Sequence, residues 1–99
     1  MVYIQLKKST NQDKKYMAIF YNEERKKIKT THFGASGMSD YTIHKDEERK
    51  ARYIARHSEN ENFNNYMSAG SLSRWILWNF PDFDRSVRDF MRRFDYKSL

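Results

Sequence analysis

The sequence contains no cysteine, one proline and only three glycines among its 99 residues. Without cysteine the chain can form neither disulfide bonds nor thiolate metal sites, so its stability has to come from packing. No apolar run approaches the ~20 residues that span a bilayer, and the opening segment lacks the apolar core of a signal peptide. We therefore expect one soluble intracellular domain over residues 1–99, without a membrane partner and without a cofactor.

Aromatic residues are abundant instead, at 16% of the chain, and the formal net charge is +6. Buried rings, each of which removes ~150–250 Å² from water, can support a compact core in a short chain. The positive charge lies mostly in residues 1–33, which carry eight basic and three acidic side chains. An excess of this kind favours a polyanion as partner; the alternative is that it serves solubility alone.

Apolar residues alternate with polar ones in three short segments of residues 1–33. The first holds Val2, Ile4 and Leu6, and the third runs from residue 26 to residue 33. The second segment, residues 14–21, is apolar on both faces, so we expect it to be the central strand. Turn-forming residues separate the segments, at 9–13 and at 22–25. This pattern predicts a three-stranded antiparallel β-meander.

Helical periodicity begins after residue 44. It predicts helices over residues 45–57 and 72–79, and a last helix that is capped by Asp82 or Asp84 and ends near Phe94. In the first of these helices the expected buried side chains are Ala51, Ile54 and Ala55, helped by Tyr53. The predicted fold class is thus α+β, with the meander (1–33) followed by a helical part (45–99) of three helices packed on one face.

Residues 34–44 join the two halves and include Gly34 and Gly37. Such a joint can present backbone N–H groups to a phosphate just before a helix. The alternative is a tight turn in which Ser39 or Asp40 caps the next helix. The joint is no Walker loop, because the Lys-Ser/Thr pair that would follow is missing.

Basic residues recur at helical spacing in the segment after the joint. Lys45, Arg49, Arg52 and Arg56 stand at i, i+4, i+7 and i+11, so one helix face can follow the phosphates of a nucleic acid. The alternative is a solvated face, because Asp46–Lys50 and Glu48–Arg52 have the spacing of stabilising i, i+4 ion pairs.

A second basic patch is expected on the strands. We expect Lys27 and Lys29 to share one face of the third strand, with further lysines around the first turn. Three tyrosines lie among these lysines, namely Tyr3, Tyr16 and Tyr21. Basic residues interleaved with aromatic rings suit single-strand binding. The alternative is that the lysines protect the sheet edges and the tyrosines pack.

Neither the histidines nor the acidic residues show the spacing of a catalytic or metal site. Asp40, Asp46, Glu48 and Glu61 are the candidates for a divalent-metal nuclease site, but nothing in their spacing requires one, and helix caps and ion pairs explain them more simply. Trp75 and Trp78 are i, i+3 neighbours, so they are either core anchors or part of a partner surface. We therefore predict no catalytic residue and no metal ligand.

Three segments resemble a family of small uncharacterised proteins encoded by nucleocytoplasmic large DNA viruses. They are HFGASGMSDYT, IHKDEERKARYIARH and AGSLSRWILWN, at residues 32–42, 43–57 and 69–79. The family pattern is HFG-x-x-G-x-SDYT, then a basic helix ending in Arg-His, then a Ser-Arg-Trp segment ending in Leu-Trp-Asn. The resemblance implies a viral origin, in the virion or in the cytoplasm or nucleus of an infected cell, and it implies no activity. It makes Asp40, Arg56, His57 and Arg74 the positions hardest to explain by packing.

These features together predict a non-enzymatic nucleic-acid-binding protein of a large DNA virus. Its preferred partner is DNA, bound with low sequence specificity in genome packaging or organisation. The expected contact residues are Lys27, Lys29, Lys45, Arg49, Arg52, Arg56 and Arg74. The first alternative is a virion structural or protein-interaction module, as a homo-oligomer that associates through Trp75, Trp78 and the Asn-rich loop at residues 58–68. The second alternative is a metal-dependent nuclease.

Overall fold

A computed structural model describes residues 2–59, 62–63 and 67–98 of the chain. In this part of the chain the fold is α+β, with a mixed four-stranded sheet, four α-helices and one π-helical turn. The strands are β1 (Val2–Lys8), β2 (Lys14–Tyr21), β3 (Lys27–Ala35) and β4 (Tyr96–Ser98). The helices are α1 (Tyr41–His44), α2 (Glu47–Ser58), α3 (Ala69–Leu72) and α4 (Phe83–Arg93), and the π-helical turn η1 (Ser73–Leu77) continues α3.

The predicted meander is confirmed: β1, β2 and β3 are consecutive antiparallel neighbours with β2 inside the sheet. Asn22 shapes the β2–β3 turn, where its side-chain oxygen accepts hydrogen bonds from the backbone N–H groups of Glu24 and Lys26, both at 3.0 Å. The prediction missed β4, which pairs with β1 in parallel. Three residues are too few for a periodic signal, and this strand is held by its pairing with β1.

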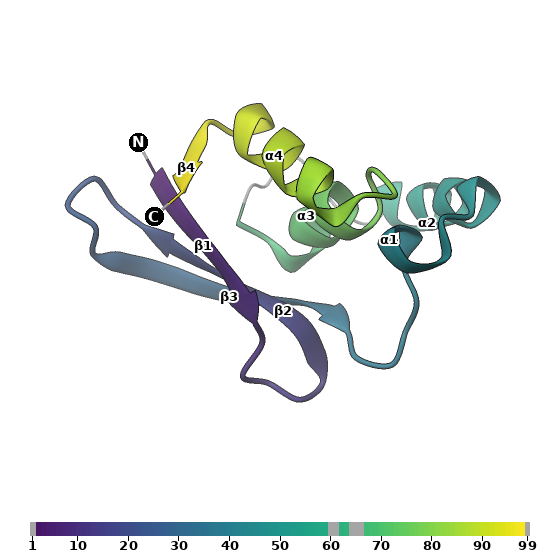
Figure 1. Cartoon of the computed structure of the whole chain (residues 1–99), viewed down its shortest axis with the longest axis horizontal. Coiled ribbons are helices and arrows are strands. Elements are labelled where there is room, and N and C mark those ends of the chain that lie inside the picture. Colours follow the sequence, from purple (N-terminus) through teal and green to yellow (C-terminus); the bar gives the residue numbers. More distant parts are fainter. Residues whose placement is uncertain (1, 60–61, 64–66, 99) are drawn as a thin grey trace.

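Helices α3 and α4, together with η1, cover one face of the sheet, whereas α1 and α2 lie beyond its end (Figure 1). Alternate residues of the strands point toward α3, α4 and η1, and Phe20 and Phe33 are fully buried there beside Phe90 of α4. The apolar residues at helical spacing in and beside α4, namely Phe83, Val87, Met91 and Phe94, all pack against this core. Asp82 caps α4, accepting hydrogen bonds from the N–H groups of Asp84 and Arg85.

The helical part differs from the prediction in two places. A short helix, α1, precedes α2, and the expected helix over residues 72–79 starts earlier and changes its winding. In η1 the Trp78 N–H donates to the carbonyl of Ser73 at 3.0 Å, a bond that spans five residues rather than four. A π-helical turn of this kind shifts the faces that an α-helical pattern assigns to the residues.

The molecule is elongated, with extents of 42 × 28 × 25 Å. The β2–β3 turn lies at one end of the long axis, while α1 and α2 lie at the other end (Figure 1). Because β3 runs from the first end toward the second, its beginning and its last residues belong to different surfaces. This arrangement decides which of the predicted site residues can act together.

Candidate nucleic-acid interface

The predicted contact residues do not form one surface. Lys27 and Lys29 lie at the beginning of β3, whereas Arg49, Arg52 and Arg56 lie on α2, at the opposite end of the molecule (Figure 1). The expectation that Lys27 and Lys29 share a face is wrong. A β-bulge pairs Phe20 with Lys29 and Tyr21 with Lys27, so the two lysines follow opposite faces of the sheet.

The tyrosines of the expected strand patch are also divided. Tyr3 and Tyr21 are cross-strand partners on the face that the helices leave open, and the guanidinium of Arg25 lies 5.3 Å from the centre of the Tyr3 ring. Tyr16 lies on the covered face instead, stacked on Phe83 with ring centroids 5.0 Å apart. Tyr16 is therefore a packing residue.

The arginines of α2 are exposed, as a contact surface requires. Arg52 forms a loose ion pair with Glu48, with 3.9 Å between nitrogen and oxygen and both side chains mostly in solvent. A pair of this kind contributes ~0–1 kcal/mol and opens easily for a phosphate. Lys45 is exposed as well, in the turn between α1 and α2, where its φ of 57° ends α1.

The expected buried side of α2 is confirmed for Tyr53, partly for Ile54, which is half-buried, and is wrong for the two alanines. Tyr53 is the one residue of this helix that is buried, while Ala51 and Ala55 are exposed. The Tyr53 ring stacks on Trp78 with centroids 4.2 Å apart and planes 3° apart, and His57 stacks on Tyr53 at 4.2 Å. The helix is thus attached to the domain by a stack of rings, which leaves most of its surface to solvent.

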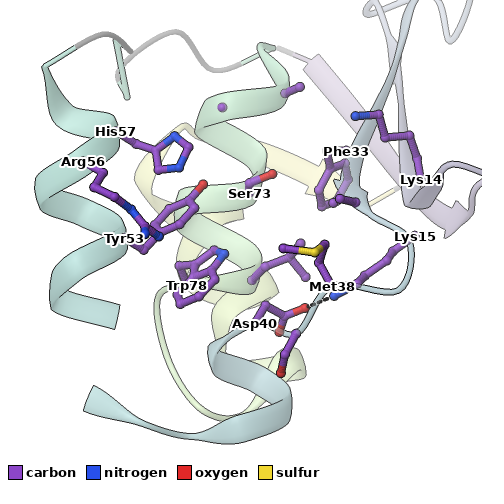
Figure 2. A pocket seen from close by; sticks show the side chains of 16 residues that line it. Lys14, Lys15, Phe33, Met38, Asp40, Tyr53, Arg56, His57, Ser73 and Trp78 are labelled. Atoms are coloured by element: carbon purple, nitrogen blue, oxygen red, sulfur yellow. Dashed lines mark hydrogen bonds and ion pairs between the residues drawn. The ribbon is translucent and has the colours of Figure 1, made fainter. Parts of the chain in front are cut away.

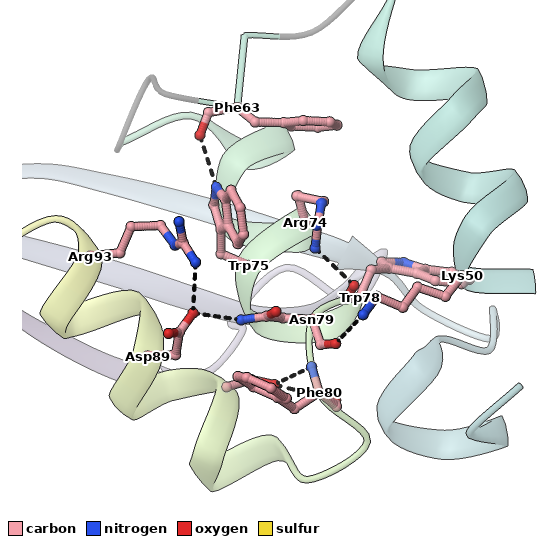
Figure 3. Close-up of polar contacts among 10 residues, drawn as sticks. Lys50, Phe63, Arg74, Trp75, Trp78, Asn79, Phe80, Asp89 and Arg93 are labelled. Atoms are coloured by element: carbon pink, nitrogen blue, oxygen red, sulfur yellow. Dashed lines mark hydrogen bonds and ion pairs between the residues drawn. The ribbon is translucent and has the colours of Figure 1, made fainter. Parts of the chain in front are cut away.

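Arg74 is not on this surface. It donates a hydrogen bond to the carbonyl of Trp78 at 3.0 Å, and its guanidinium lies 4.3 Å from the centre of the Trp75 ring (Figure 3). Arg93 approaches the same ring at 3.8 Å. Burial lowers the pKa of Arg74, and the charge of Arg93 lowers it further. These contacts give Arg74 a structural role.

Polar contacts extend from this arginine pair to α2 (Figure 3). Asn79 donates to a carboxylate oxygen of Asp89 at 2.7 Å, and Arg93 approaches the same oxygen at 3.4 Å. Lys50 donates to the carbonyl of Asn79 at 2.6 Å. Burial, and then the charge of Arg74, lower the pKa of this lysine. Lys50 is therefore the second attachment of α2.

Both tryptophans serve packing within the chain. Trp75 donates its indole N–H to the carbonyl of Phe63 at 2.9 Å and lies between the guanidinium groups of Arg74 and Arg93 (Figure 3). Trp78 lies under Tyr53 and also contacts the ring of His44. Both are partly buried against the core.

The joint after β3 is a turn in which Asp40 caps a helix, as one of the two alternatives predicts. Asp40 accepts hydrogen bonds from the backbone N–H and the hydroxyl of Thr42, at the start of α1. Its other carboxylate oxygen accepts from the ammonium group of Lys15 at 2.6 Å. Because Asp40 is only 2% exposed, this pair ties the beginning of β2 firmly to the joint.

A pocket of about 370 Å³ lies between the joint, the ends of β2 and β3, and the helices α2, α3 and η1 (Figure 2). Apolar groups of Phe33, Met38, Tyr53, Leu77 and Trp78 form much of its wall. Polar and charged groups surround them, and these belong to Lys14, Lys15, Ser39, Asp40, Arg56, His57 and Ser73. Arg56 thus belongs to both the arginine face of α2 and this pocket.

The predicted contact residues omit Lys14, Lys15 and His57, which line the same pocket as Arg56. A signal for the lysines was present in the predicted hairpin: the start of β2 has to lie beside the end of β3, and Lys14 is the partner of Ala35. His57 is adjacent to Arg56 in the sequence, but its place in the pocket depends on the ring stack, which no local pattern predicts.

The acidic candidates for a metal site have structural contacts. Asp46 caps α2 by accepting from the N–H groups of Glu48 and Arg49, while Asp40 and Glu48 have the partners described above. Glu61 and part of the Asn-rich loop around it lie outside the described residues. Within the part of the chain that the structure describes, no group of three or more histidine or acidic side chains has the geometry to hold a metal ion.

None of the described helices is both long and apolar enough to cross a membrane. The sequence model of a family of unknown function, DUF5754, matches residues 4–57. The match covers more than half of the chain. The protein belongs to the DUF5754 family. No significantly similar protein was found among curated proteins or among solved structures.

The part of the chain that matches DUF5754 extends from β1 nearly to the end of α2. It includes Lys14, Lys15, Asp40, Arg56 and His57, and so most of the charged side of the pocket. The opposite wall, formed by α3 and η1, comes from the sequence that follows the match. The basic helix and the joint therefore belong to the family region of the chain.

Proposed function

We propose that this DUF5754 protein binds nucleic acid, DNA in the first instance, without catalysing a reaction and with little sequence specificity. The binding surface is the arginine face of α2 together with the rim of the adjacent pocket. Its residues are Lys14, Lys45, Arg49, Arg52 and Arg56. Lys27 and Lys29, at the far end of the sheet, are left as an independent and weaker contact.

One observation carries the proposal: Arg56 of α2 and Lys14 of β2 line the same pocket. Cations from two separate parts of the chain therefore meet at one end of the molecule, and α2 extends their surface through Arg49 and Arg52, which are exposed at helical spacing. Neither Arg56 nor Lys14 forms an ion pair with another described residue. Exposed lysine and arginine side chains without an ion-pair partner can bind phosphates, and the phosphates then release their counterions.

The viral part of the proposal rests on the resemblance of residues 32–79 to small proteins of large DNA viruses. We propose that the protein acts in genome packaging or organisation, in the virion or in the infected cell. Low sequence specificity follows from the contact groups, because arginine and lysine side chains that meet phosphates carry no information about the bases.

The alternative of an interaction module that associates through Trp75 and Trp78 gains less support, because both indoles make close contacts within the chain. The nuclease alternative gains less support because Asp40 and Asp46 cap helices. Light scattering checks the first alternative, since a tight oligomer without affinity for DNA favours it. Incubation of plasmid with magnesium or manganese checks the second, which predicts cleavage.

The proposal is tested by titrating fluorescent duplex and single-stranded DNA with the protein at several salt concentrations. We expect duplex binding at low salt that weakens with a slope of ~0.9 log units per neutralised phosphate. R49Q should reduce this slope by about one contact. R88Q, which makes the same charge change at an exposed position of α4, should leave the slope unchanged. Absence of binding at low salt, or binding that salt does not affect, contradicts the proposal.

A further inference from the structure

The pocket beside α2 has an excess of positive charge. Its lining includes three cations, Lys14, Lys15 and Arg56, and one carboxylate, that of Asp40. Lys15 and Asp40 neutralise each other through their contact of 2.6 Å. Lys14 and Arg56 are left, so the lysine, arginine and aspartate side chains of the lining carry a net charge of +2. A dianion matches this charge, whereas a cation does not.

The two remaining cations approach the pocket from opposite walls. Lys14 comes from the beginning of β2, and Arg56 comes from the last turns of α2, on the other side of the hollow (Figure 2). Among the described residues neither forms an ion pair. An anion between the walls would interact with both, and the planar guanidinium of arginine binds phosphate oxygens through two hydrogen bonds at once.

The polar groups between the cations are mainly hydrogen-bond donors. Ser73 directs its hydroxyl toward the hollow, and Trp78 directs the edge that carries its indole N–H there (Figure 2). The indole N–H has no acceptor among the described residues, and an indole can donate but not accept. Ser39 adds a further hydroxyl to the lining. Donors of this kind suit phosphate oxygens, which accept hydrogen bonds when the group is ionised.

The apolar part of the wall argues against inorganic phosphate alone. Phe33 and Leu77 are buried in the core and line the pocket, and Met38 at its edge is 65% exposed. A flexible, polarisable methionine side chain adapts to the flat surface of a ring that covers it. The volume of about 370 Å³ lies at the small end of the range of ligand pockets, ~300–1,000 Å³. It therefore suits a ligand about as large as one nucleotide.

We propose that this pocket binds a phosphomonoester that carries a nucleoside, with its phosphate between Lys14 and Arg56 and its base against Met38. Two ligands contain this phosphomonoester, a free nucleoside monophosphate and the 5′-terminal nucleotide of a nucleic-acid strand. The second ligand rests on the proposed function, because it makes the pocket the end of the surface on α2. If the strand end is the ligand, the protein prefers strands with a 5′-terminal phosphate to strands without one.

Calorimetric titration with adenosine monophosphate, adenosine and inorganic phosphate tests the ligand class. We expect the nucleotide to bind more tightly than either part alone, because both the cations and the apolar wall contribute. R56Q and K14Q should each weaken nucleotide binding about tenfold or more, the effect of losing one charge-assisted hydrogen bond. R88Q should leave it unchanged. Equal binding of adenosine and its monophosphate overturns the proposal, as does tighter binding of a phosphotyrosine peptide.

Fluorescence anisotropy with two single-stranded oligonucleotides of one sequence, with and without a 5′-phosphate, distinguishes the two ligands. A terminal-phosphate site predicts a preference for the phosphorylated strand that R56Q abolishes. R52Q, on the same helix but outside the pocket lining, should weaken both strands and keep their ratio. Nucleotide binding without affinity for either strand supports the pocket with a free nucleotide as ligand and contradicts the proposed function. Salt-sensitive binding of both strands with equal affinity, together with no binding of the nucleotide, overturns the pocket and leaves the proposed function standing.

Discussion

Tyr53 of α2 lies flat on the indole of Trp78, with ring planes 3° apart and centroids 4.2 Å apart. These residues are 25 positions apart in the sequence, and their stack is the main apolar attachment of a helix whose other side chains are exposed or only partly buried. The stack also forms one wall of the pocket, because Tyr53, His57 and Trp78 all line it. The position of the arginine face of α2 therefore depends mainly on this pair of rings, together with the hydrogen bond of Lys50 to the Asn79 carbonyl.

Y53A should detach α2 from the domain. Loss of a buried aromatic side chain costs ~3–5 kcal/mol in a core, and Tyr53 is 8% exposed, so we expect a loss near the lower end of that range. Denaturant unfolding followed by circular dichroism measures the change. Y53F keeps the ring and is the matched control. Equal stability of Y53A and the wild type would show that α2 is held by Lys50 instead.

Replacing each of the two glycines of the joint by alanine should lower folding stability by different amounts. Both have positive φ, 78° for Gly34 and 79° for Gly37, where a Cβ is strained by ~1–2 kcal/mol. At Gly34 a Cβ would also lie 2.8 Å from Cδ1 of Leu77, whereas at Gly37 it would meet open space. We expect G37A to cost about 1 kcal/mol and G34A about 3 kcal/mol, because overpacking adds to the strain.

Thermal unfolding of the two glycine variants measures this difference, and a double-mutant cycle with L77A identifies its cause. Although L77A is itself destabilising, it removes the atom that the new Cβ would meet. The cost of G34A should therefore fall toward that of G37A in the L77A background. A cost of G34A that L77A leaves unchanged would assign the whole effect to the backbone conformation.

Much of the fold could be predicted from local patterns. The alternation in β1 to β3 and the stripe from Phe83 to Phe94 describe elements that pack through a regular face. Prediction failed where packing depends on distant partners. The alanines of α2 have the spacing of a buried stripe, but the helix lies at the end of the sheet, where the core has no surface left to cover them. Its attachment is Tyr53 on Trp78, a contact that no spacing within α2 predicts.

Only part of the candidate site could be predicted, because its other residues depend on irregular backbone. Helical spacing places Arg49, Arg52 and Arg56 on one face, and these residues are exposed on α2. The bulge in β3 separates Lys27 from Lys29, because one extra residue reverses the alternation of faces. The π-helical turn similarly shifts the faces of its residues, and Arg74 contacts the Trp75 ring and the Trp78 carbonyl instead of joining the arginine face of α2. Where the backbone is irregular, as at the bulge and the π-helical turn, the spacing of residues in the sequence no longer predicts which side chains share a face.

Tyr16 should make the protein less stable at alkaline pH. Burial raises its pKa above the ordinary value of 10.0, and the nearby carboxylate of Asp40 raises it further. An unfolded chain releases this proton near pH 10.0, whereas the folded chain keeps it to a higher pH. Folding stability from this group is thus complete below pH 10.0 and is lost as the pH rises through the pKa of the folded state.

Y16F, which keeps the ring but cannot ionise, isolates this effect. The difference in unfolding free energy between wild type and Y16F should change above pH 10.0, in the direction that disfavours the wild type. Other tyrosines and the lysines titrate in both proteins and cancel in the difference. A difference that stays constant from neutral to alkaline pH would mean that Tyr16 has the same pKa in the folded and unfolded chains.

Asp40 should be needed for stability and not for chemistry. D40N leaves the ammonium group of Lys15 beside a neutral amide, although Lys15 is only 17% exposed. Removing one partner of a buried ion pair costs ~3–5 kcal/mol, and partial exposure of the lysine places our expectation near 3 kcal/mol. Replacing both partners, as in K15M combined with D40N, should recover part of that loss. Urea unfolding measures both variants, and a fully stable D40N would contradict the structural role.

Substitutions of Arg74 and Arg49 should affect different properties: R74Q should lower folding stability, and R49Q should lower DNA affinity. Arg74 is held by the Trp78 carbonyl and the Trp75 ring, so R74Q should cost ~1.5–3 kcal/mol of folding stability, the usual contribution of a hydrogen bond from a charged group. Arg49 is exposed, so R49Q should change stability by no more than ~0.5 kcal/mol while it weakens DNA binding. Thermal unfolding and a DNA titration of each variant, at a temperature where both are folded, give the two readouts. If R74Q keeps its stability and loses as much DNA affinity as R49Q, Arg74 belongs to the binding surface after all.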